Sequence, residues 1–220
     1  MGRKGYYLVF EGPDGSGKTT QSQNTLKYLE ELGMKKDEDF IYLREPGGTK
    51  IGEKVRQILL DPENEDLADR TESLLYNASR SQTTKQIVMP AVDAGKLVVA
   101  DKSYISTIAY QAVALGMPID QIEQVIMFAI YNFTPDSVYL FDIPVEVGLS
   151  RCGQGGKDRI EQRDTSYHER VRNGYLLYAR ANKDIFRIFD STPSVEEVWE
   201  QVKHDLDNRV LEEWFERSGR

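Results

Sequence analysis

Short runs of apolar and β-branched residues alternate along the chain with longer stretches whose apolar positions recur at helical spacing. The short runs predict five strands, at Tyr6–Glu11, Phe40–Arg44, Leu97–Asp101, Ser137–Asp142 and Ile185–Phe189. The longer stretches predict helices at Lys18–Gly33, Lys50–Asp61, Asp69–Ala94, Ser103–Gly116, Ile119–Phe133, Val145–Arg151, Arg163–Asn182 and from Ser194 towards Glu213. Because the strands are apolar almost throughout, we expect an α/β fold in which helices cover both faces of a parallel sheet.

The length and the apolar pattern together predict one domain. The chain has 220 residues, enough for one well-buried core, and no stretch has the composition of a linker, so we expect a single domain over residues 1–220. The last predicted helix opens with a capping box at Ser194–Glu197, and its apolar positions indicate a packing face. The stretch Val125–Ile130 is apolar nearly all round, which is typical either of the core or of a subunit interface.

The balance of charge restricts the possible partners. The formal net charge is −8 at pH 7, so most of the surface repels polyanions, and we expect neither nucleic acid nor membrane as a partner. An anionic ligand must then be held by a local cluster of positive charge. The single cysteine, Cys152, excludes an internal disulfide and fits a reducing compartment. Since no apolar leader precedes the first strand and no apolar run reaches membrane-spanning length, we expect a cytoplasmic protein.

The segment after the first predicted strand fits the phosphate-binding pattern G-x-x-x-x-G-K-[ST]. Its glycines let successive backbone N–H groups point into one concavity, Lys18 can reach the outer phosphates, and the Thr19 hydroxyl can hold Mg²⁺. The expected binding residues are Gly12, Pro13, Asp14, Gly15, Ser16, Gly17, Lys18, Thr19 and Thr20. A strand before the loop and a helix after it disfavour the alternative, a flexible glycine turn without a ligand.

Polar residues also follow other predicted strands. Asp101 ends an apolar strand, where a P-loop enzyme carries a second metal-binding acid, and a helix N-cap is a compatible role for it. Glu45 lies in a glycine-rich segment, Arg44–Arg56, which on its own would be explained equally well as a tight turn with solvated charges. Ligands of parallel sheets bind at the carboxyl ends of the strands, so we expect Gly12, Glu45, Asp101 and Asp142 to converge on one rim.

Arginines and lysines form a third group of candidates. Arg56 and Arg80 lie in predicted helices that begin near this rim. Further cations crowd a glycine-containing segment: Arg151, Lys157, Arg159, Arg163, Arg170 and Arg172. Phosphoryl transfer needs positive charge aimed at the moving group, and a mobile lid over about residues 150–163 is expected to supply it. For the last three arginines, a solvated helix face with ion pairs is an equally good interpretation.

Several motifs in the right order resemble the thymidylate kinase family, whose members phosphorylate dTMP to dTDP with ATP. The resemblance spans about residues 7–192. Its motifs are Phe10–Gln21, Arg44–Thr49 with Gly52, Glu53 and Arg56, Leu74–Tyr76 with Arg80, Asp101 with Ser106, Ala109–Gln111, Pro135 with Asp136, Val147–Arg151 and Asp158–Glu161. The resemblance implies a P-loop NTPase fold with a five-stranded parallel sheet, ATP as co-substrate, Mg²⁺ as cofactor and a homodimer.

Carried over residue by residue, the resemblance implies a role for each matching position. Lys18 and the loop amides hold the phosphates of ATP, while Thr19 and Asp101 serve Mg²⁺. The acceptor nucleotide is bound by Glu45, Arg56, Tyr76, Arg80, Lys102, Thr107 and Gln111. Within this set Arg56 contacts the phosphate and Tyr76 stacks on thymine, and the base edge faces Arg80, Thr107 and Gln111.

The resemblance also indicates which groups carry the transfer. One branch of the family has an arginine in the P-loop where this chain has Gly15, so the catalytic cation is expected from the lid instead. Arg159 is the first candidate, with Arg151 and Lys157 behind it. The candidates for catalysis are therefore Lys18, Asp14, Arg56 and Arg159.

The chain departs from the family pattern after the third predicted strand. The family has Asp-Arg followed by Tyr or His, whereas this chain has Asp101, Lys102 and Ser103. Arginine binds a phosphate through a planar fork and lysine as a point charge, so the replacement changes how the acceptor phosphate is held. Ser103 also leaves room where the family has a ring.

Two other functions fit parts of the sequence. A deoxynucleoside kinase must deprotonate a neutral hydroxyl, for which Glu45 is a candidate base, and the Lys102–Ser103 pair weakly resembles that class. A monophosphate kinase needs no such base, because the second pKa of its acceptor phosphate is about 6. A P-loop module without kinase activity is the third hypothesis, but Asn182–Asp184 lacks the spacing of a guanine-reading motif. The contexts of Arg56 and Arg80 favour the monophosphate kinase.

Overall fold

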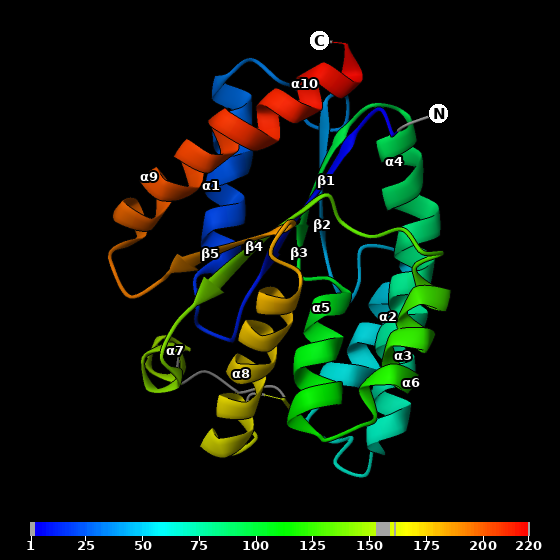
Figure 1. Cartoon of the computed structure of the whole chain (residues 1–220). Helices are drawn as coiled ribbons and strands as arrows, with labels where there is room; N and C mark the ends of the chain where they lie inside the picture. Colours follow the sequence, from blue (N-terminus) through cyan, green and yellow to red (C-terminus); the bar gives the residue numbers. More distant parts are fainter. Residues whose placement is uncertain (1–2, 153–158, 161, 220) are drawn as a thin grey trace.

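The computed structural model describes residues 3–152, 159, 160 and 162–219. Five strands form one sheet in which every pairing is parallel (Figure 1). They are β1 (Tyr6–Glu11), β2 (Phe40–Arg44), β3 (Leu97–Asp101), β4 (Ser137–Asp142) and β5 (Phe186–Asp190). Four of these match the predicted strands residue for residue, and β5 lies one residue later than predicted.

The predicted helices are also present, with ends that differ from the prediction by a few residues. They are α1 (Lys18–Glu31), α2 (Lys50–Leu60), α3 (Asp69–Thr83), α4 (Met89–Asp93), α5 (Tyr104–Thr107), α6 (Ile119–Ala129), α7 (Val145–Arg151), α8 (Thr165–Ala181), α9 (Val195–Asp205) and α10 (Glu212–Ser218). The predicted capping box is confirmed, because Ser194 and Glu197 each accept the other's backbone N–H at the start of α9. Among the described residues, no helix is long and apolar enough to cross a membrane.

Three of the predicted helices contain a π-helical segment that the apolar pattern does not reveal. The segment η1 (Thr84–Val88) joins α3 to α4, η2 (Ile108–Ala114) continues α5, and η3 (Leu206–Leu211) joins α9 to α10. Such segments are rare and often occur at functional sites. The segment η2 fits this tendency, because its residues Tyr110 and Gln111 line a cavity.

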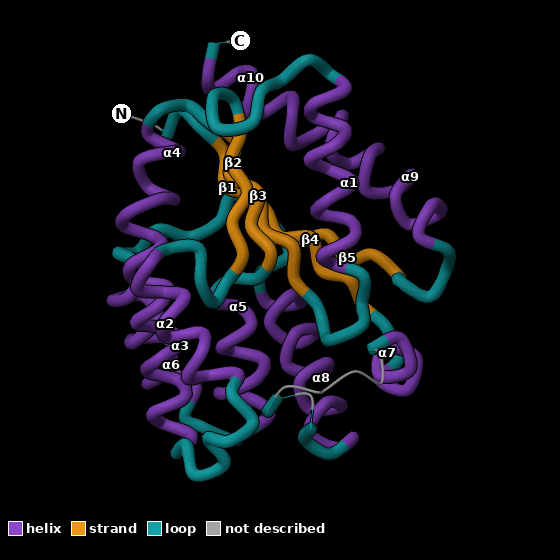
Figure 2. The backbone as a smooth tube through the Cα atoms, turned by 180° about the vertical axis from the view of Figure 1, so that it is seen from behind, coloured by secondary structure: helices purple, strands orange, loops and turns teal. Residues whose placement is uncertain are grey.

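Both faces of the sheet are buried, as apolar strands predict. Successive side chains of a strand point to opposite faces: Leu8 and Phe10 of β1 belong to one hydrophobic cluster, and Tyr7 and Val9 to another. Helices α1, α9 and α10 cover the first face, and α2 to α6 with α8 lie on the second (Figure 2). The expected two-sided architecture is therefore confirmed.

The strand order brings the loops of the site together. The order is β2-β3-β1-β4-β5, so the chain winds in opposite directions on the two sides of β1. Ligands of open α/β sheets bind at the carboxyl ends of the strands beside such a reversal. The P-loop leaves β1 there, and the backbone N–H of Glu45, just after β2, donates to the carbonyl of Asp101 at the end of β3, over 2.9 Å.

Candidate active site

The loop between β1 and α1 forms a cradle for an anion. Gly17 is the N-cap of α1 in a left-handed conformation, with φ of 81°, and no described side chain caps the first turn. The N–H groups at the start of α1 are therefore available to a phosphate. A Cβ built on Gly17 would meet no atom within 4 Å, so the space above these amides is open.

Gly15 packs the loop tightly against α7. Its φ is 74°, and a Cβ added there would lie 2.0 Å from the carbonyl oxygen of Gly148. Any side chain at this position must push α7 away from the loop. The P-loop arginine of one family branch therefore cannot be accommodated here without moving that helix.

A cavity of about 320 Å³ opens in front of the loop. Its cationic lining residues are Lys18, Arg44, Arg56, Arg80 and Lys102, against the carboxylates of Asp14, Glu45 and Asp101. Positive charge therefore outnumbers negative charge in the cavity, although the chain as a whole carries −8. This is the local cluster that an anionic ligand requires in an acidic protein. We call this cavity the acceptor pocket.

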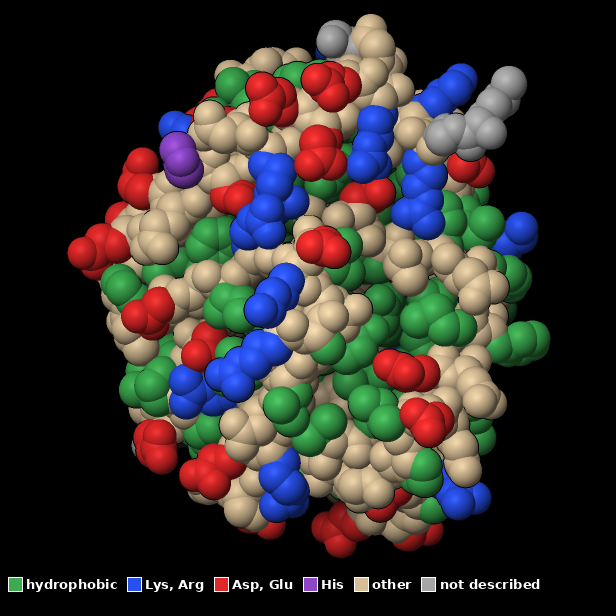
Figure 3. Space-filling model, in the orientation of Figure 1, with side chains coloured by type: hydrophobic (Ala, Val, Ile, Leu, Met, Phe, Trp, Pro, Cys, Tyr) green, Lys and Arg blue, Asp and Glu red, His purple; other side chains and the backbone are tan. Residues whose placement is uncertain are grey.

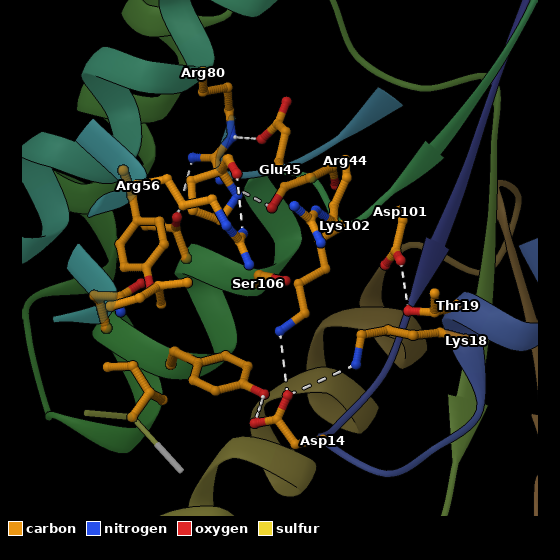
Figure 4. A pocket seen from close by; sticks show the side chains of 18 of the residues that line it. Asp14, Lys18, Thr19, Arg44, Glu45, Arg56, Arg80, Asp101, Lys102 and Ser106 are labelled. Atoms are coloured by element: carbon orange, nitrogen blue, oxygen red, sulfur yellow. Dashed lines mark hydrogen bonds and ion pairs between the residues drawn. The ribbon is translucent and has the colours of Figure 1, made fainter. Parts of the chain in front are cut away.

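Asp14 holds two lysines at the mouth of the loop (Figure 4). One carboxylate oxygen of Asp14 lies 3.3 Å from Lys102 Nζ and 3.7 Å from Lys18 Nζ. The other oxygen accepts a hydrogen bond of 2.8 Å from the hydroxyl of Tyr110. Lys102 also lies over the ring of Tyr110, with Nζ 5.1 Å from the ring centroid.

These contacts set the charge states at the loop. Burial alone raises the pKa of Asp14, but the charges of Lys102 and Lys18 outweigh burial and hold that pKa well below its usual range. Burial lowers the pKa of Lys102, and the Asp14 carboxylate reverses this effect and leaves it raised. The pKa of Lys18 is lowered, first by burial and then by the charge of Lys102. Asp14 is therefore a fixed negative charge, which makes it a weak base and a firm anchor.

Thr19 and Asp101 meet beside the loop, as the metal hypothesis requires. The Thr19 hydroxyl donates to a carboxylate oxygen of Asp101 over 2.6 Å. Among the described residues, no three His, Cys, Asp or Glu side chains form a metal-binding group. A hydroxyl and one carboxylate fit Mg²⁺, which keeps several waters and takes its other ligands from nucleotide phosphates.

A buried ion pair joins the second strand to the third helix. Arg80 Nε donates to Glu45 over 2.7 Å, and both side chains are almost fully buried. The Arg80 guanidinium also donates to the hydroxyl of Thr107 over 3.0 Å and to the carbonyl of Ser103 over 3.0 Å. Burial raises the pKa of Glu45, and the charge of Arg80 opposes this shift. Because these hydrogen bonds orient the guanidinium, Arg80 acts as a framework for its neighbours in the pocket wall.

A second cavity, of about 410 Å³, also borders the P-loop and shares Gly15 with the acceptor pocket. It is lined by Gly15, Ser16, Gly17, Thr20, Gln21, Arg151, Ser191, Pro193, Ser194, Val195 and Val198. The hydroxyls of Ser16 and Ser191 are buried without a hydrogen-bond partner among the described residues. Arg151 is fixed to this wall by hydrogen bonds to the carbonyls of Ser191 and Thr192. We call this cavity the loop-side cavity.

The structure thus brings most of the predicted site residues together. The predicted acceptor-binding set lines the acceptor pocket: Glu45, Arg56, Tyr76, Arg80, Lys102, Thr107 and Gln111. Arg56 Nη1 also donates to the carbonyl of Pro46 over 3.1 Å. Gly12 and Pro13 line neither cavity, although the carbonyl of Pro13 accepts a hydrogen bond from Lys18.

The other cations take separate positions. Arg159 pairs with Glu72 and donates to the carbonyl of Leu59, and the structure does not bring it to the P-loop. Lys157 and most of the predicted lid, residues 153–158 and 161, lie outside the described residues. Asp142 lies at the carboxyl end of β4, on the rim as expected, where it pairs with Arg172 and lines neither cavity. Arg170 donates to the carbonyl of Ala114, which makes these two arginines structural.

Two buried carboxylates support the pocket although the sequence analysis gave them no role. Glu11 is fully buried and accepts hydrogen bonds from the backbone N–H of Ser103 and from the hydroxyls of Ser106 and Tyr175. Ser103 therefore caps α5 and contacts Glu11, besides lining the pocket. Glu72, also fully buried, contacts Gln111 and Arg159. A charged residue at the end of an apolar strand could have indicated Glu11, whereas nothing in the sequence near Glu72 indicates its role.

Comparison with known proteins shows which protein family the chain matches. The model of the family described as "Thymidylate kinase" matches residues 10–202. The chain is 39% identical over 212 residues to a thymidylate kinase of Lactobacillus helveticus, covering 95% of this chain and 99% of that protein. It is 41% identical to one of Finegoldia magna, with 92% and 98% covered, and 40% identical to one of Thermosipho melanesiensis, with 93% and 98% covered.

Proposed function

The chain belongs to the thymidylate kinase family and phosphorylates dTMP to dTDP, and we propose that its two cavities hold the two nucleotides of this reaction. The observation that carries the proposal is their arrangement: both cavities border the P-loop and share Gly15 in their walls, and the acceptor pocket also includes Lys18 and Thr19. ATP, which the family uses, then extends from the loop-side cavity to Lys18, where its outer phosphate faces dTMP in the acceptor pocket. The family assignment replaces the deoxynucleoside kinase and non-kinase hypotheses.

ATP occupies the loop-side cavity and the cradle. Its phosphates take the free amides at the start of α1 and the charge of Lys18. Its nucleoside part fits between the loop, Arg151 and the segment that follows β5, where the buried hydroxyls of Ser16 and Ser191 still lack partners.

The acceptor dTMP occupies the acceptor pocket. Arg56 and Lys102 are the cations that face its phosphate, and Tyr76 provides a ring for stacking on thymine. Glu45, Arg80, Thr107 and Gln111 form the wall around the sugar and the base. In this arrangement Asp14 holds Lys102 and Lys18 between the two phosphate groups.

Transfer then depends on alignment and charge neutralisation. A phosphate acceptor with a second pKa of about 6 is already ionised at neutral pH, so the enzyme needs no strong base. The low pKa of Asp14 agrees with this, because a carboxylate of that kind positions cations and does not remove protons. Lys18 and Lys102 carry positive charge to the ends of the two phosphate chains.

Mg²⁺ is proposed to bind beside the loop, held by the Thr19 hydroxyl and the Asp101 carboxylate. When bound, it neutralises phosphate charge. The hydroxyl and carboxylate must then exchange their mutual hydrogen bond for contacts to the ion and its waters.

The chain falls in the branch with glycine in the P-loop, a proposal that rests on the contact between Gly15 and Gly148. The cation for the moving phosphoryl group must then come from another segment, and Arg159 remains the first candidate. To act, its guanidinium must leave Glu72, to which it is bound in the structure. Arg151 is the alternative, because it already lies in the wall of the loop-side cavity.

A homodimer is the proposed assembly, and a cytoplasmic location the proposed setting. Phe128 of α6 is 88% exposed, and Leu74 of α3 and Ile58 of α2 are also exposed. These three helices lie side by side, and hydrophobic side chains appear on the corresponding side of the molecule (Figure 3). Exposed apolar side chains on neighbouring helices suit a second copy of the chain.

Steady-state kinetics with two acceptors tests the reaction. We expect ADP formation from ATP and Mg²⁺ with dTMP as acceptor, and none above background with thymidine. Turnover of thymidine alone would refute the assignment of the acceptor pocket to a monophosphate.

Lys18→Ala tests the P-loop. The substitution removes a buried charge at the phosphates, and loss of one preorganised group of this kind lowers kcat by about 10²–10³-fold. Lys27→Ala, which removes an exposed charge from the same helix, serves as the matched control and should retain full activity. Equal rates for the two variants would contradict the proposed ATP site.

A further inference from the structure

Glu72 is a buried carboxylate that contacts Gln111, a residue in the wall of the acceptor pocket. It lies in α3, its side chain is fully buried, and it contacts residues from two other parts of the chain. One carboxylate oxygen accepts a hydrogen bond of 2.7 Å from Nε2 of Gln111, in η2. The other oxygen pairs with the guanidinium groups of Arg159 and Arg163, and the distance to Arg163 is 2.9 Å.

The partners of Glu72 compensate its burial. A buried charge is costly unless it is paired and its remaining lone pairs are used. Two guanidinium groups compensate the charge of Glu72, and Arg163 is itself fixed over the ring of Tyr167, 4.5 Å from the ring centroid. Both oxygens of Glu72 therefore accept hydrogen bonds, one from Gln111 and the other from the guanidinium groups.

The hydrogen bond with Glu72 fixes the orientation of the Gln111 amide. A carboxylate only accepts hydrogen bonds, so the NH₂ group of Gln111 must face Glu72. Gln111 lines the acceptor pocket, and its amide carbonyl is the end of the amide that Glu72 does not engage. A free glutamine can turn either end of its amide to a ligand, and Glu72 removes this choice.

The Thr107 hydroxyl is oriented in a similar way, by its hydrogen bond with Arg80. Its hydroxyl oxygen accepts from Arg80 Nη1 over 3.0 Å, and all described partners of that guanidinium are acceptors. The hydroxyl proton of Thr107 therefore points away from Arg80 and is available to a ligand. The pocket thus offers one fixed acceptor, from Gln111, beside one donor, from Thr107.

We propose that Glu72 is a positioning residue that selects the acceptor base by fixing the Gln111 amide. Thymine and uracil have an N–H at ring position 3 and a carbonyl at position 4, which match an acceptor beside a donor. Cytosine has a bare nitrogen at position 3 and an amino group at position 4, which match neither. A polar site rejects a ligand that leaves its buried groups unpaired. The inference rests on the proposed placement of dTMP in the acceptor pocket.

Glu72→Gln tests the inference with three acceptors: dTMP, dUMP and dCMP. A neutral amide at position 72 can donate to Gln111, so the Gln111 amide is free to turn its NH₂ group into the pocket. We expect the ratio of kcat/KM for dTMP over dCMP to fall at least tenfold, chiefly through KM. The ratio for dTMP over dUMP should not change, because these bases share the same edge.

Two further variants separate positioning from structural damage. Arg163→Gln removes one guanidinium but leaves the contact between Glu72 and Gln111, so its dTMP-to-dCMP ratio should stay at the wild-type value. Gln111→Leu should lower the ratio as Glu72→Gln does, and combining the two should lower it no further. General damage would instead reduce turnover of all three acceptors alike. If Glu72→Gln folds poorly, Gln111→Leu still tests whether this amide sets the ratio.

The outcomes distinguish this inference from the proposed function. If the wild-type enzyme does not phosphorylate dTMP, the proposed function fails and this inference falls with it. If the wild type phosphorylates dTMP and Glu72→Gln or Gln111→Leu keeps the dTMP-to-dCMP ratio within twofold of the wild type, only the inference is overturned.

Discussion

Lys102 determines the character of the acceptor pocket at the scale of single residues. It follows β3 in a left-handed conformation, with φ of 73°, and this backbone turn directs it towards Asp14. The family has an arginine here. A lysine brings the same charge without the planar fork, so it neutralises a phosphate but orients it less. Asp14 and the ring of Tyr110 supply part of the missing orientation by holding the ammonium group.

Lys102→Arg is expected to keep or improve the use of dTMP. The variant has the same charge and the same backbone strain, so only the geometry of the phosphate contact changes. A bidentate contact should lower the KM for dTMP by up to about tenfold, which corresponds to ~1.4 kcal/mol. Lys102→Met, which removes the charge, should raise this KM. A marked loss of dTMP turnover in Lys102→Arg would show that the pocket is adapted to lysine.

Individual site residues were predictable from the sequence where a short motif or a strand end marks them. Lys18, Thr19 and Asp101 follow from a loop motif and a strand end, and the structure brings all three to one site. Glu72 could not be found this way, because its partners are 39 and 91 residues away in the chain. Its burial and its pairing exist only once α3, η2 and the segment after α7 have packed together.

At the scale of elements, the C-terminal helices complete one face of the sheet. Helices α9 and α10 are joined through η3, and their apolar side chains pack with α1 on β1, β3 and β4. Trp214 of α10 is fully buried, and its indole N–H donates to the carbonyl of Gly95, just before β3, over 2.9 Å. This single contact ties the end of the chain to the strand that carries Asp101.

Trp214→Ala is expected to destabilise the protein substantially. Loss of a fully buried tryptophan removes about 3–5 kcal/mol from the free energy of unfolding. In a chain of this size each kcal/mol lowers Tm by roughly 2–4 °C. Trp199→Ala, at a partly buried tryptophan in α9, is the control and should lower Tm less. Equal losses from both variants in thermal unfolding would mean that α10 is not anchored as described.

The sequence predicted the positions of the strands well because their apolar pattern is continuous. The strands from Tyr6 to Asp142 needed no correction, since nearly every residue in them is buried or intermediate. The π-helical segments were not predicted, because a π-turn leaves the same residues apolar and changes only their rotation around the axis. The position of Gln111 in η2 could therefore not be derived from spacing alone.

At the scale of the whole molecule, an acidic protein concentrates its cations where the phosphates meet. A net charge of −8 surrounds a pocket in which Lys and Arg outnumber Asp and Glu. The opposite feature, exposed apolar surface, lies on α2, α3 and α6, and two of these helices, α2 and α3, border the acceptor pocket through Arg56, Tyr76 and Arg80. Pairing of two chains through these helices would therefore support the acceptor site from behind.

Phe128→Glu should dissociate the proposed homodimer. Phe128 is 88% exposed in the single chain, so a charge there leaves the fold intact and disfavours only an apolar contact between copies. The mass in solution, measured by light scattering, should fall from two chains to one. Leu177→Glu, at an exposed leucine of α8, is the matched control and should remain dimeric. A wild-type monomer, or a dimeric Phe128→Glu, would contradict the proposal.

The claim on which the account depends is that two nucleotides, one in each cavity, meet end to end at the P-loop. A crystal structure of the protein with ADP, Mg²⁺ and dTMP tests it most directly. We predict ADP in the loop-side cavity with its phosphates on the amides after Gly15, and dTMP in the acceptor pocket with its phosphate at Lys102 and Arg56 and its base at Gln111. Either nucleotide bound elsewhere, with the acceptor pocket left empty, would contradict the account.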